Sequence, residues 1–212
     1  MWPRMIPDAV GWLLRLDGRM SWRVDVSPGS TEVFLTFDDG PVPEVTPWVL
    51  DTLKELGVKA TFFCIGRNAA EHPAIFARIS AEGHGIGNHT WDHPSGWNVN
   101  PRAYYRSMIK CQKLTGTPLF RPPYGRISNR QAAAIARRSA IVMWDVLAHD
   151  FNDRWTDDQR VHEVVDRTRP GTIIVFHDSL KCDGRMRRSM PRVVRRLLAD
   201  GHTFSVLPGS VK

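Results

Sequence analysis

Short apolar segments alternate with amphipathic segments along most of this 212-residue chain. The apolar segments have the length of buried strands, whereas the amphipathic ones repeat their apolar residues every three or four positions, as helices do. Such alternation favours parallel strand pairing and an α/β fold. We expect strands near residues 32–37, 60–65, 85–87, 119–120, 140–146, 172–176 and 203–207, and helices near 46–56, 73–81, 102–114, 131–138, 157–168 and 191–199.

The same pattern predicts a single domain. With 42% hydrophobic residues the chain has enough apolar side chains for one sizeable core, and it shows no internal repeat, low-complexity tract or linker. Residues 1–31 mix Trp, Pro and Arg, and we expect them to form a lead-in packed on the outside of the fold. Residues 32–212 are then the domain itself.

Polar residues follow several of the expected strands at their carboxyl ends. They are Asp38-Asp39, His89, the segment after Phe120, and His177. In a parallel barrel the chemistry gathers at this end of the strands. The four segments are therefore the candidates for a functional site.

The carboxylate pair belongs to the segment Thr36-Phe37-Asp38-Asp39-Gly40. Two adjacent carboxylates at a strand end are costly, because desolvation and mutual repulsion both oppose their charge. A metal ion bound by one of them would relieve the repulsion and leave the other free to act as a base. Taken alone, Asp-Asp-Gly is more often a solvated turn, so this interpretation depends on the other segments.

Two histidines, His89 and His93, are four residues apart, and one helical turn would place both on the same side. With Asp39 they make two imidazoles and one carboxylate, which is the ligand pattern of a catalytic divalent-metal site with open positions. Zinc is the default ion for that set, with cobalt, manganese and nickel as alternatives. A histidine pair at this spacing is by itself more often structural or on the surface.

Two further segments have an ordinary and a functional interpretation. Arg121-Pro122-Pro123-Tyr124-Gly125 follows a strand directly and is either a plain proline turn or a rigid loop. As a rigid loop it would aim Arg121 at a carboxylate and present the Tyr124 N–H to an oxyanion. His177 ends the strand at 172–176 and, alone, would more often be a histidine at the edge of the core than a catalyst.

Charge and cysteine content narrow the class of protein. The net charge of +7 suits a polyanionic partner, but the basic residues are scattered, apart from a run at Arg185 to Arg196, and no nucleic-acid module accompanies them. The three cysteines lack the spacing of a disulfide framework or a zinc ribbon.

The apolar patch from Val10 to Leu14 is too short and interrupted for a signal peptide or membrane span, so a cytoplasmic location is the default expectation.

Five segments together resemble the polysaccharide deacetylase family (NodB-like, carbohydrate esterase family four). TFDDG, HTWDH, RPPYG, WDVLAHDF and VFHD occur in the family's order, and the likeness spans roughly Glu32 to Leu207. The resemblance implies an incomplete or distorted (β/α)₇ barrel of the NodB-homology type. It also implies metal-dependent hydrolysis of an N-acetyl group on a carbohydrate such as a chitin oligosaccharide or peptidoglycan.

The resemblance also assigns roles to individual residues. It implies that Asp39, His89 and His93 bind the metal, and that Asp38 is the base that deprotonates the attacking metal-bound water. His177 would be the general acid, oriented by Asp150. Arg121 would hold Asp38, and the backbone N–H of Tyr124 would help to stabilise the oxyanion.

The sequence departs from the family pattern near the expected cleft. The family's Asp-x-x-Asp-Trp is Leu147-Ala148-His149-Asp150-Phe151 here, so the first Asp is missing and Phe151 replaces Trp. Val175 stands where a Leu is usual, which puts a smaller residue in the pocket that would hold the acetyl methyl group. Tyr124, Phe151, Val175 and Trp91 are the residues we expect to contact substrate, with Trp97 a further aromatic near the cleft mouth.

Other functions stay open on the sequence. One is deacetylation of a non-sugar amide or an O-acetyl ester, and another is a catalytically silent carbohydrate-binding protein that keeps the cleft. We expect an acetylated oligo- or polysaccharide as partner, no nucleic acid, no transmembrane segment, and a monomer.

Overall fold

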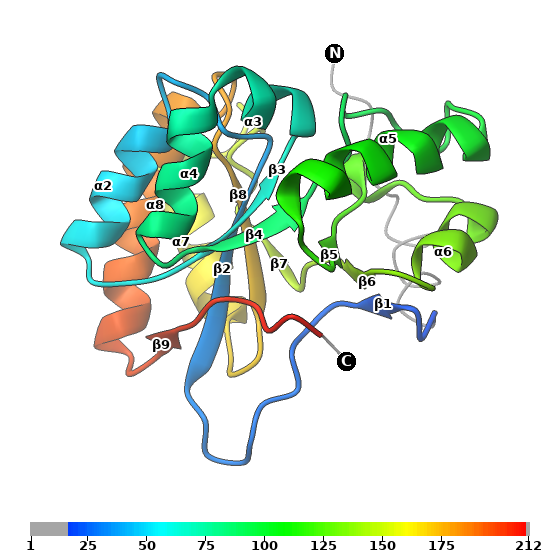
Figure 1. The fold of residues 1–212 in the computed structure, drawn as a ribbon. Coiled ribbons are helices and arrows are strands. Elements are labelled where there is room, and N and C mark those ends of the chain that lie inside the picture. Colours follow the sequence, from blue (N-terminus) through cyan, green and yellow to red (C-terminus); the bar gives the residue numbers. More distant parts are fainter. Residues whose placement is uncertain (1–16, 211–212) are drawn as a thin grey trace.

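The structure, a computed structural model, describes residues 17–210, in which strands and helices alternate along the chain (Figure 1). The strands are β1 (Met20–Ser21), β2 (Glu32–Asp38), β3 (Thr61–Cys64), β4 (Gly85–Asn88), β5 (Leu119–Phe120), β6 (Ala140–Val142), β7 (Val146–Leu147), β8 (Ile173–His177) and β9 (Thr203–Phe204). The α-helices are α2 (Thr46–Glu55), α3 (Gly66–Glu71), α4 (Pro73–Ala81), α5 (Pro101–Thr115), α6 (Asn129–Ile135), α7 (Asp157–Arg167) and α8 (Asp183–Ala199), with the 3-10 turn η1 at Pro123–Gly125.

The strands form one curled sheet in the order β1-β6-β5-β4-β3-β2-β8-β7. Every pair of these neighbours is parallel, and β9 pairs in parallel with the start of β2. β2 lies between β3 and β8, so the Asp-Asp segment follows an interior strand of the sheet. The expected α/β class and distorted barrel of a single domain are confirmed.

The apolar run at 140–146 is not one strand, as the sequence suggested, but two. β6 pairs with β5 and β1, whereas β7 pairs with β8 on the other side of the sheet. The Met143 N–H donates to Ser21 O at 2.8 Å, and the Asp145 N–H donates to Ile173 O at 3.1 Å. The segment therefore crosses from one edge region to the other, which the largely apolar sequence at 140–146 did not reveal.

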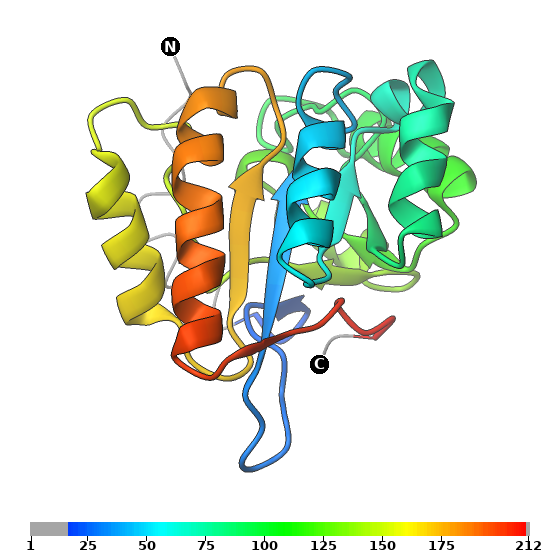
Figure 2. The ribbon, with the colours of Figure 1, turned by 90° about the vertical axis from the view of Figure 1, so that its left-hand side faces the viewer.

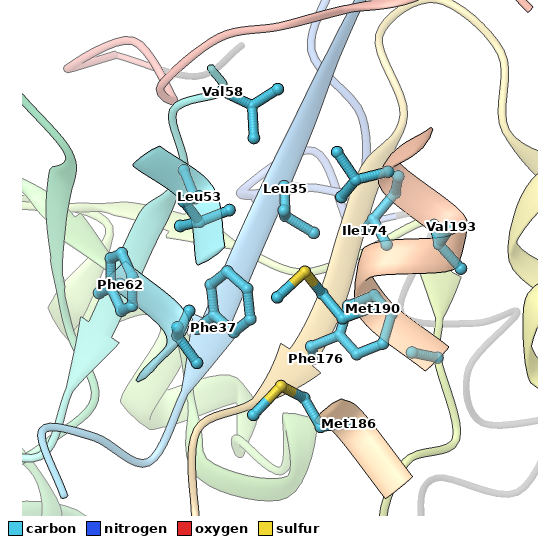
Figure 3. Packing of buried hydrophobic residues seen from close by; sticks show 14 of the residues in the cluster. Leu35, Phe37, Leu53, Val58, Phe62, Ile174, Phe176, Met186, Met190 and Val193 are labelled. Atoms are coloured by element: carbon cyan, nitrogen blue, oxygen red, sulfur yellow. The ribbon is translucent and has the colours of Figure 1, made fainter. Parts of the chain in front are cut away.

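Helices cover the outer face of the β2 and β8 region. Figure 2 shows α7, α8, α2 and α4 in this order from left to right, with β8 and β2 between α8 and α2. Leu35 and Phe37 of β2 point into this layer, where they meet Phe176 of β8 and Met190 of α8 (Figure 3). The outer core is therefore built from alternate residues of the strands.

The other alternate residues face the inside of the curled sheet. Phe34 packs there with Phe63, Val142 and Ile173. Because side chains alternate along a strand, the residues two and four positions after Phe34, Thr36 and Asp38, point to the same inner side. The inner core thus ends at the carboxyl edge of the sheet in polar groups.

Some helix boundaries differ from the expected ones. α8 begins at Asp183, although Pro191 suggested a start at 191. Pro191 lies inside the helix, where it cannot donate the usual hydrogen bond to the Arg187 carbonyl. Helix α3 was not expected, and α6 begins at Asn129 because Ser128 and Gln131 form a capping box.

The lead-in is described only from residue 17 onward, and residues 1–16 lie outside the described part of the chain. Within that part, β1 pairs with β6 at Met20 and Ser21, so the segment adds an edge strand to the sheet. In residues 17–210 we find no helix that is long and apolar enough to cross a membrane.

Candidate active site

The two adjacent carboxylates turn into one small pocket at the end of β2. Asp38 is the last residue of the strand and points inward, as the alternation requires. Asp39 has a φ of 86°, a left-handed conformation that brings its side chain to the same side. The Asn68 side-chain amide donates to Asp39 O at 2.9 Å and fixes this peptide. Both carboxylates line a cavity of about 20 Å³, which has room for about one water or ion.

Asp38 forms a fully buried ion pair with Arg121. Arg121 Nη1 lies 2.7 Å from Asp38 Oδ1 and also donates to Thr36 Oγ1 at 2.8 Å. The remaining guanidinium nitrogens donate to Val142 O and Met143 O, at 3.2 and 3.0 Å. Each nitrogen of the buried guanidinium thus has an acceptor, which meets the condition for placing a charge in the core. Burial lowers the pKa of Arg121, and the charge of Asp38 opposes that shift.

Asp39 lies beside two imidazoles. The distances from Asp39 Oδ1 are 3.1 Å to His93 Nε2 and 3.7 Å to His89 Nε2. The segment that carries both histidines is a loop after β4 rather than the helical turn we expected, since Thr90 and His93 have φ values of 66° and 55°. The loop brings the two rings together by left-handed residues instead of by helical periodicity.

The donor atoms of Asp39, His89 and His93 fit a divalent metal ion. One ligand atom from each lies within 4.8 Å of the others. The His89 Nδ1–H donates to Arg121 O at 2.8 Å, which leaves the Nε2 lone pair facing Asp39. Burial lowers the pKa of His89 to about 4, so this imidazole is neutral, as a ligand must be. The three residues are therefore a candidate metal site.

The pKa of Asp39 agrees with a ligand role. Burial raises it, but the hydrogen bond and charge of His93, together with the nearby His177 and His89, outweigh burial. The net result is a pKa of Asp39 well below its ordinary value, so the carboxylate is ionised and able to bind a cation.

His177 faces the same cavity from the end of β8 and is held by Asp150. Its Nδ1 lies 2.8 Å from Asp150 Oδ1, and its backbone N–H donates to Asp150 Oδ2 at 2.7 Å. Burial lowers the pKa of His177, but the charge and hydrogen bond of Asp150, with Asp39 and Asp38, raise it to about 9. Arg185 Nε donates to Asp150 O at 2.6 Å and anchors the partner.

The residues expected to contact substrate lie in different places. Val175 and Tyr124 line the cavity, and Phe151 packs edge-on to His177 with ring centroids 5.7 Å apart. Trp91 is not among the lining residues: it packs against Gly66, and Lys110 Nζ lies 3.7 Å from the centre of its ring. A wider depression of about 290 Å³ adjoins Asp39 and Tyr124 and is also lined by residues such as Leu180.

Sequence reasoning missed two apolar walls and one buried carboxyl group. Trp144 and Leu147 line the cavity, because the segment between β6 and β7 crosses beside it. Asp178 accepts hydrogen bonds from Thr46 Oγ1 at 2.6 Å and from the Gly40 N–H at 3.0 Å. It thereby fixes the turn after Asp39, and its position directly after His177 was the only signal for it.

Comparison with known proteins places this geometry in a family. The family model for polysaccharide deacetylase matches residues 25–143, which is more than half of the chain. The chain belongs to the polysaccharide deacetylase family of hydrolases, also called carbohydrate esterase family 4. The expected family and enzyme class are thereby confirmed.

Individual relatives show how far the likeness extends. The chain is 38% identical to a peptidoglycan-N-acetylglucosamine deacetylase from Bacillus cereus, over 84% of this chain and 67% of that protein. It is 36% identical to a chitooligosaccharide deacetylase from Azorhizobium caulinodans, over 74% of this chain and 79% of that protein. It covers only 37% of a longer relative, the peptidoglycan-N-acetylglucosamine deacetylase PgdA of Listeria monocytogenes.

Solved structures give the same fold. A crystal structure of a peptidoglycan N-acetylglucosamine deacetylase in complex with a hydroxamate-type benzamide superimposes with a TM-score of 0.83 at 32% identity, over 98% of this chain and 96% of that one. A mutant of a CE4 family pseudoenzyme with restored enzymatic activity matches with a TM-score of 0.76 at 25% identity, over 92% of this chain and 72% of that one. The same fold therefore occurs in active deacetylases and in a pseudoenzyme.

Proposed function

We propose that this chain removes acetyl groups from an N-acetylated glycan that contains N-acetylglucosamine. The observation that carries the proposal is the arrangement of two buried pairs around one cavity. Asp38 is held by Arg121 on one side, and His177 is held by Asp150 on the other. A group that accepts a proton and a group that donates one thus face the same small space, beside a candidate metal site.

Asp39, His89 and His93 would hold the divalent metal, with zinc the ion we propose for two imidazoles and one carboxylate. When bound, the ion polarises the acetyl carbonyl and lowers the pKa of a water. Asp38 Oδ1 accepts a hydrogen bond from Arg121. Asp38 Oδ2 lies 4.0 Å from His89 Nε2, one of the candidate metal ligands. Asp38 is therefore placed to accept the proton of the attacking water.

His177 is placed to give a proton to the leaving nitrogen. Because its pKa is raised to about 9, the ring is protonated at neutral pH. Its Nδ1 is engaged by Asp150, so Nε2 carries the proton that faces the cavity. Transfer of this proton as the C–N bond breaks releases the glycan as a free amine and the acetyl group as acetate.

The remaining residues shape the space for the acetyl group. Val175, Leu147 and Trp144 form an apolar wall of the cavity, which suits a methyl group. We propose that the backbone N–H of Tyr124 stabilises the oxyanion and that its ring, with Phe151, contacts the sugar. The wider depression beside Asp39 would then hold the sugar ring. We further propose that the chain acts as a monomer and without nucleic acid.

Acetate release tests the proposal against its alternatives. The purified chain is incubated with N-acetylglucosamine oligomers, peptidoglycan, an O-acetylated glycan and a non-sugar acetamide, before and after chelation and with added Zn²⁺, Co²⁺, Mn²⁺ or Ni²⁺. We expect acetate from an N-acetylated glycan, lost on chelation and restored by metal. Release only from the ester or the non-sugar amide would assign the alternative substrate. No release from any substrate would assign a carbohydrate-binding protein.

A further inference from the structure

The positive charge of this protein is concentrated in one part of the chain. Residues 93–144 contain nine of the 29 basic residues and none of the 22 acidic ones, so this segment carries a charge of +9. The remainder has 20 basic and 22 acidic residues and is slightly negative. The segment runs from the loop of His93 through α5, β5 and α6 to β6. The net charge of +7 therefore arises from this segment of the chain.

In the basic run at 185–196, which stood out in the sequence, four of the six arginines by contrast form ion pairs. Arg188 pairs with Asp157, Arg192 with Asp158, and Arg187 with Asp183. These pairs link α8 to α7 or to its own first turn. Most of the densest run of arginines is thus paired, whereas the segment at 93–144 contains no acidic residue that could pair with its basic side chains.

A groove between α5 and α6 collects three of the arginines. It has a volume of about 740 Å³ and is lined by Arg102 and Arg106 of α5 and Arg130 of α6, with Tyr105 and Gln131 between them. All three arginines are exposed, and within residues 17–210 none of them forms an ion pair. Among the described residues, no acidic side chain lines the groove. Figure 1 shows the two helices next to each other beyond β5 and β6.

A series of contacts connects the groove with the candidate active site. The Tyr124 ring packs on His93, with ring centroids 4.6 Å apart. The Arg126 guanidinium lies 6.0 Å from the centre of the Tyr124 ring and 4.8 Å from that of Trp97. Gln131 lines the groove, and its side-chain amide donates to the carbonyl oxygen of Gly96, the residue before Trp97, at 2.8 Å. A polymer seated at the cavity therefore has a basic and aromatic path toward the groove.

We propose that this groove binds carboxylate groups of the glycan, so that the preferred substrate is a carboxylate-bearing strand such as peptidoglycan rather than an uncharged chitin oligosaccharide. The proposal rests on the proposed deacetylase function. Guanidinium groups bind carboxylates through paired hydrogen bonds, and three arginines without an ion pair in the described part of the chain suit several such groups. Peptidoglycan strands carry a carboxylate on each lactyl group that bears no peptide, and carboxylates on the peptides where these are attached, whereas chitin oligosaccharides have none.

Two triple variants with the same change of charge test the groove. Arg102→Gln, Arg106→Gln and Arg130→Gln remove the groove arginines, and Arg188→Gln, Arg192→Gln and Arg196→Gln remove three on α8. Both lower the net charge from +7 to +4. The values of kcat and KM are measured on peptidoglycan glycan strands and on an N-acetylglucosamine hexamer, at low and high salt.

We expect the groove variant to lose roughly tenfold in kcat/KM on the carboxylated strands, through KM, since three exposed contacts of modest strength are removed. The activity of the groove variant on the hexamer should stay within about twofold of the wild type. The α8 variant should stay within the same range on both substrates. The preference of the wild type for the carboxylated strands should fall with added salt. Equal losses on both substrates, or in both variants, would overturn the groove assignment.

A binding measurement separates this proposal from the proposed function. Strand binding is measured with Asp38→Asn, alone and combined with the groove changes, and with duplex DNA as a competitor. Weaker strand binding only in the combined variant supports the groove even if the wild type released no acetate, a result that would reject the deacetylase function alone. DNA that binds more tightly than the strands, and in a groove-dependent way, would reject the glycan as occupant.

Discussion

A single carboxylate holds both the side chain and the backbone of His177. Asp150 Oδ1 lies 2.8 Å from His177 Nδ1, and Asp150 Oδ2 accepts the backbone N–H of the same residue at 2.7 Å. Since both oxygens are used on one residue, the imidazole has little freedom to turn. The Asp150 side chain is completely buried, so its charge acts on the ring with little screening by water.

The first prediction follows from this pair and concerns the pH profile. Asp150 helps to raise the pKa of His177 to about 9, so the protonated acid persists up to that pH and is lost as pH rises through it. Asp150→Asn should shift the basic limb of the kcat/KM profile to lower pH by roughly one unit or more. Each unit corresponds to about 1.4 kcal/mol of lost interaction between Asp150 and the protonated imidazole. The profile is recorded at fixed metal. Asp157→Asn, which removes a partner of Arg160 and Arg188, is the control and should leave the limb in place.

The second prediction concerns the metal site. His93→Ala and His89→Ala should each abolish stoichiometric metal binding, because two of the three protein ligands cannot hold the ion alone. The fold should survive, since the apolar clusters of the core do not include either residue. Elemental analysis and circular dichroism of the dialysed variants provide the check. His84 is buried and is not one of the three candidate ligands, so the variant His84→Ala serves as a control that should keep the metal.

The third prediction concerns the base. Asp38→Asn should slow acetate release by roughly 10²–10⁴, the usual contribution of a general acid or base. Metal content should be unchanged, because Asp38 is not in the Asp39, His89 and His93 cluster. Single-substrate rates and elemental analysis of the same samples give both readings. A variant as active as the wild type would show that Asp38 does not act as the base.

The fourth prediction concerns the buried ion pair. Arg121→Met should destabilise the fold by roughly 3–5 kcal/mol, because it leaves the Asp38 charge buried without its partner. The double variant Arg121→Met, Asp38→Asn should recover part of this loss, since the unpaired charge is gone. Urea unfolding of the two variants and of Asp38→Asn completes the cycle. Additive effects of the two substitutions would contradict a coupled pair.

The fifth prediction concerns Asp178. Burial raises its pKa to about 8, with the charge of Asp39 adding to the shift and the hydrogen bond from Thr46 opposing it. The folded state thus holds this proton more tightly than the unfolded state, where the ordinary pKa is 3.8. Stability from this group is complete at low pH and falls as pH rises toward about 8. In chelator-treated protein, Asp178→Asn should flatten the decline of the urea midpoint between pH 5 and 8, and an unchanged slope would contradict it.

The sequence predicted much of this molecule from local patterns. Alternating apolar and amphipathic segments predicted the parallel α/β fold, because strand and helix periodicities are set by backbone geometry alone. The expectation that Asp38, Asp39, His89 and His177 meet at one edge also follows from local information. Parallel strands end on the same side, so polar residues after several of them must be neighbours.

The sequence did not predict how individual segments bend or where they cross. The run at 140–147 is uniformly apolar apart from Asp145, and only the pairing partners Ser21 and Ile173 divide it between two strands. That crossing places Trp144 and Leu147 on the cavity wall. In the same way, Pro191 indicated a helix start, yet packing of α8 on the sheet carries the helix through it.

What the sequence by itself determined is the set of chemical groups and the edge of the sheet at which they gather. What only the tertiary structure decided is their relative orientation. Asp39 faces the histidines because its backbone is left-handed at a φ of 86°, and His93 joins it through a second left-handed residue rather than a helical turn. Such conformations are stabilised by contacts distant in sequence, here the Asn68 amide and the Asp178 carboxyl group, and these contacts exist only once the chain has folded.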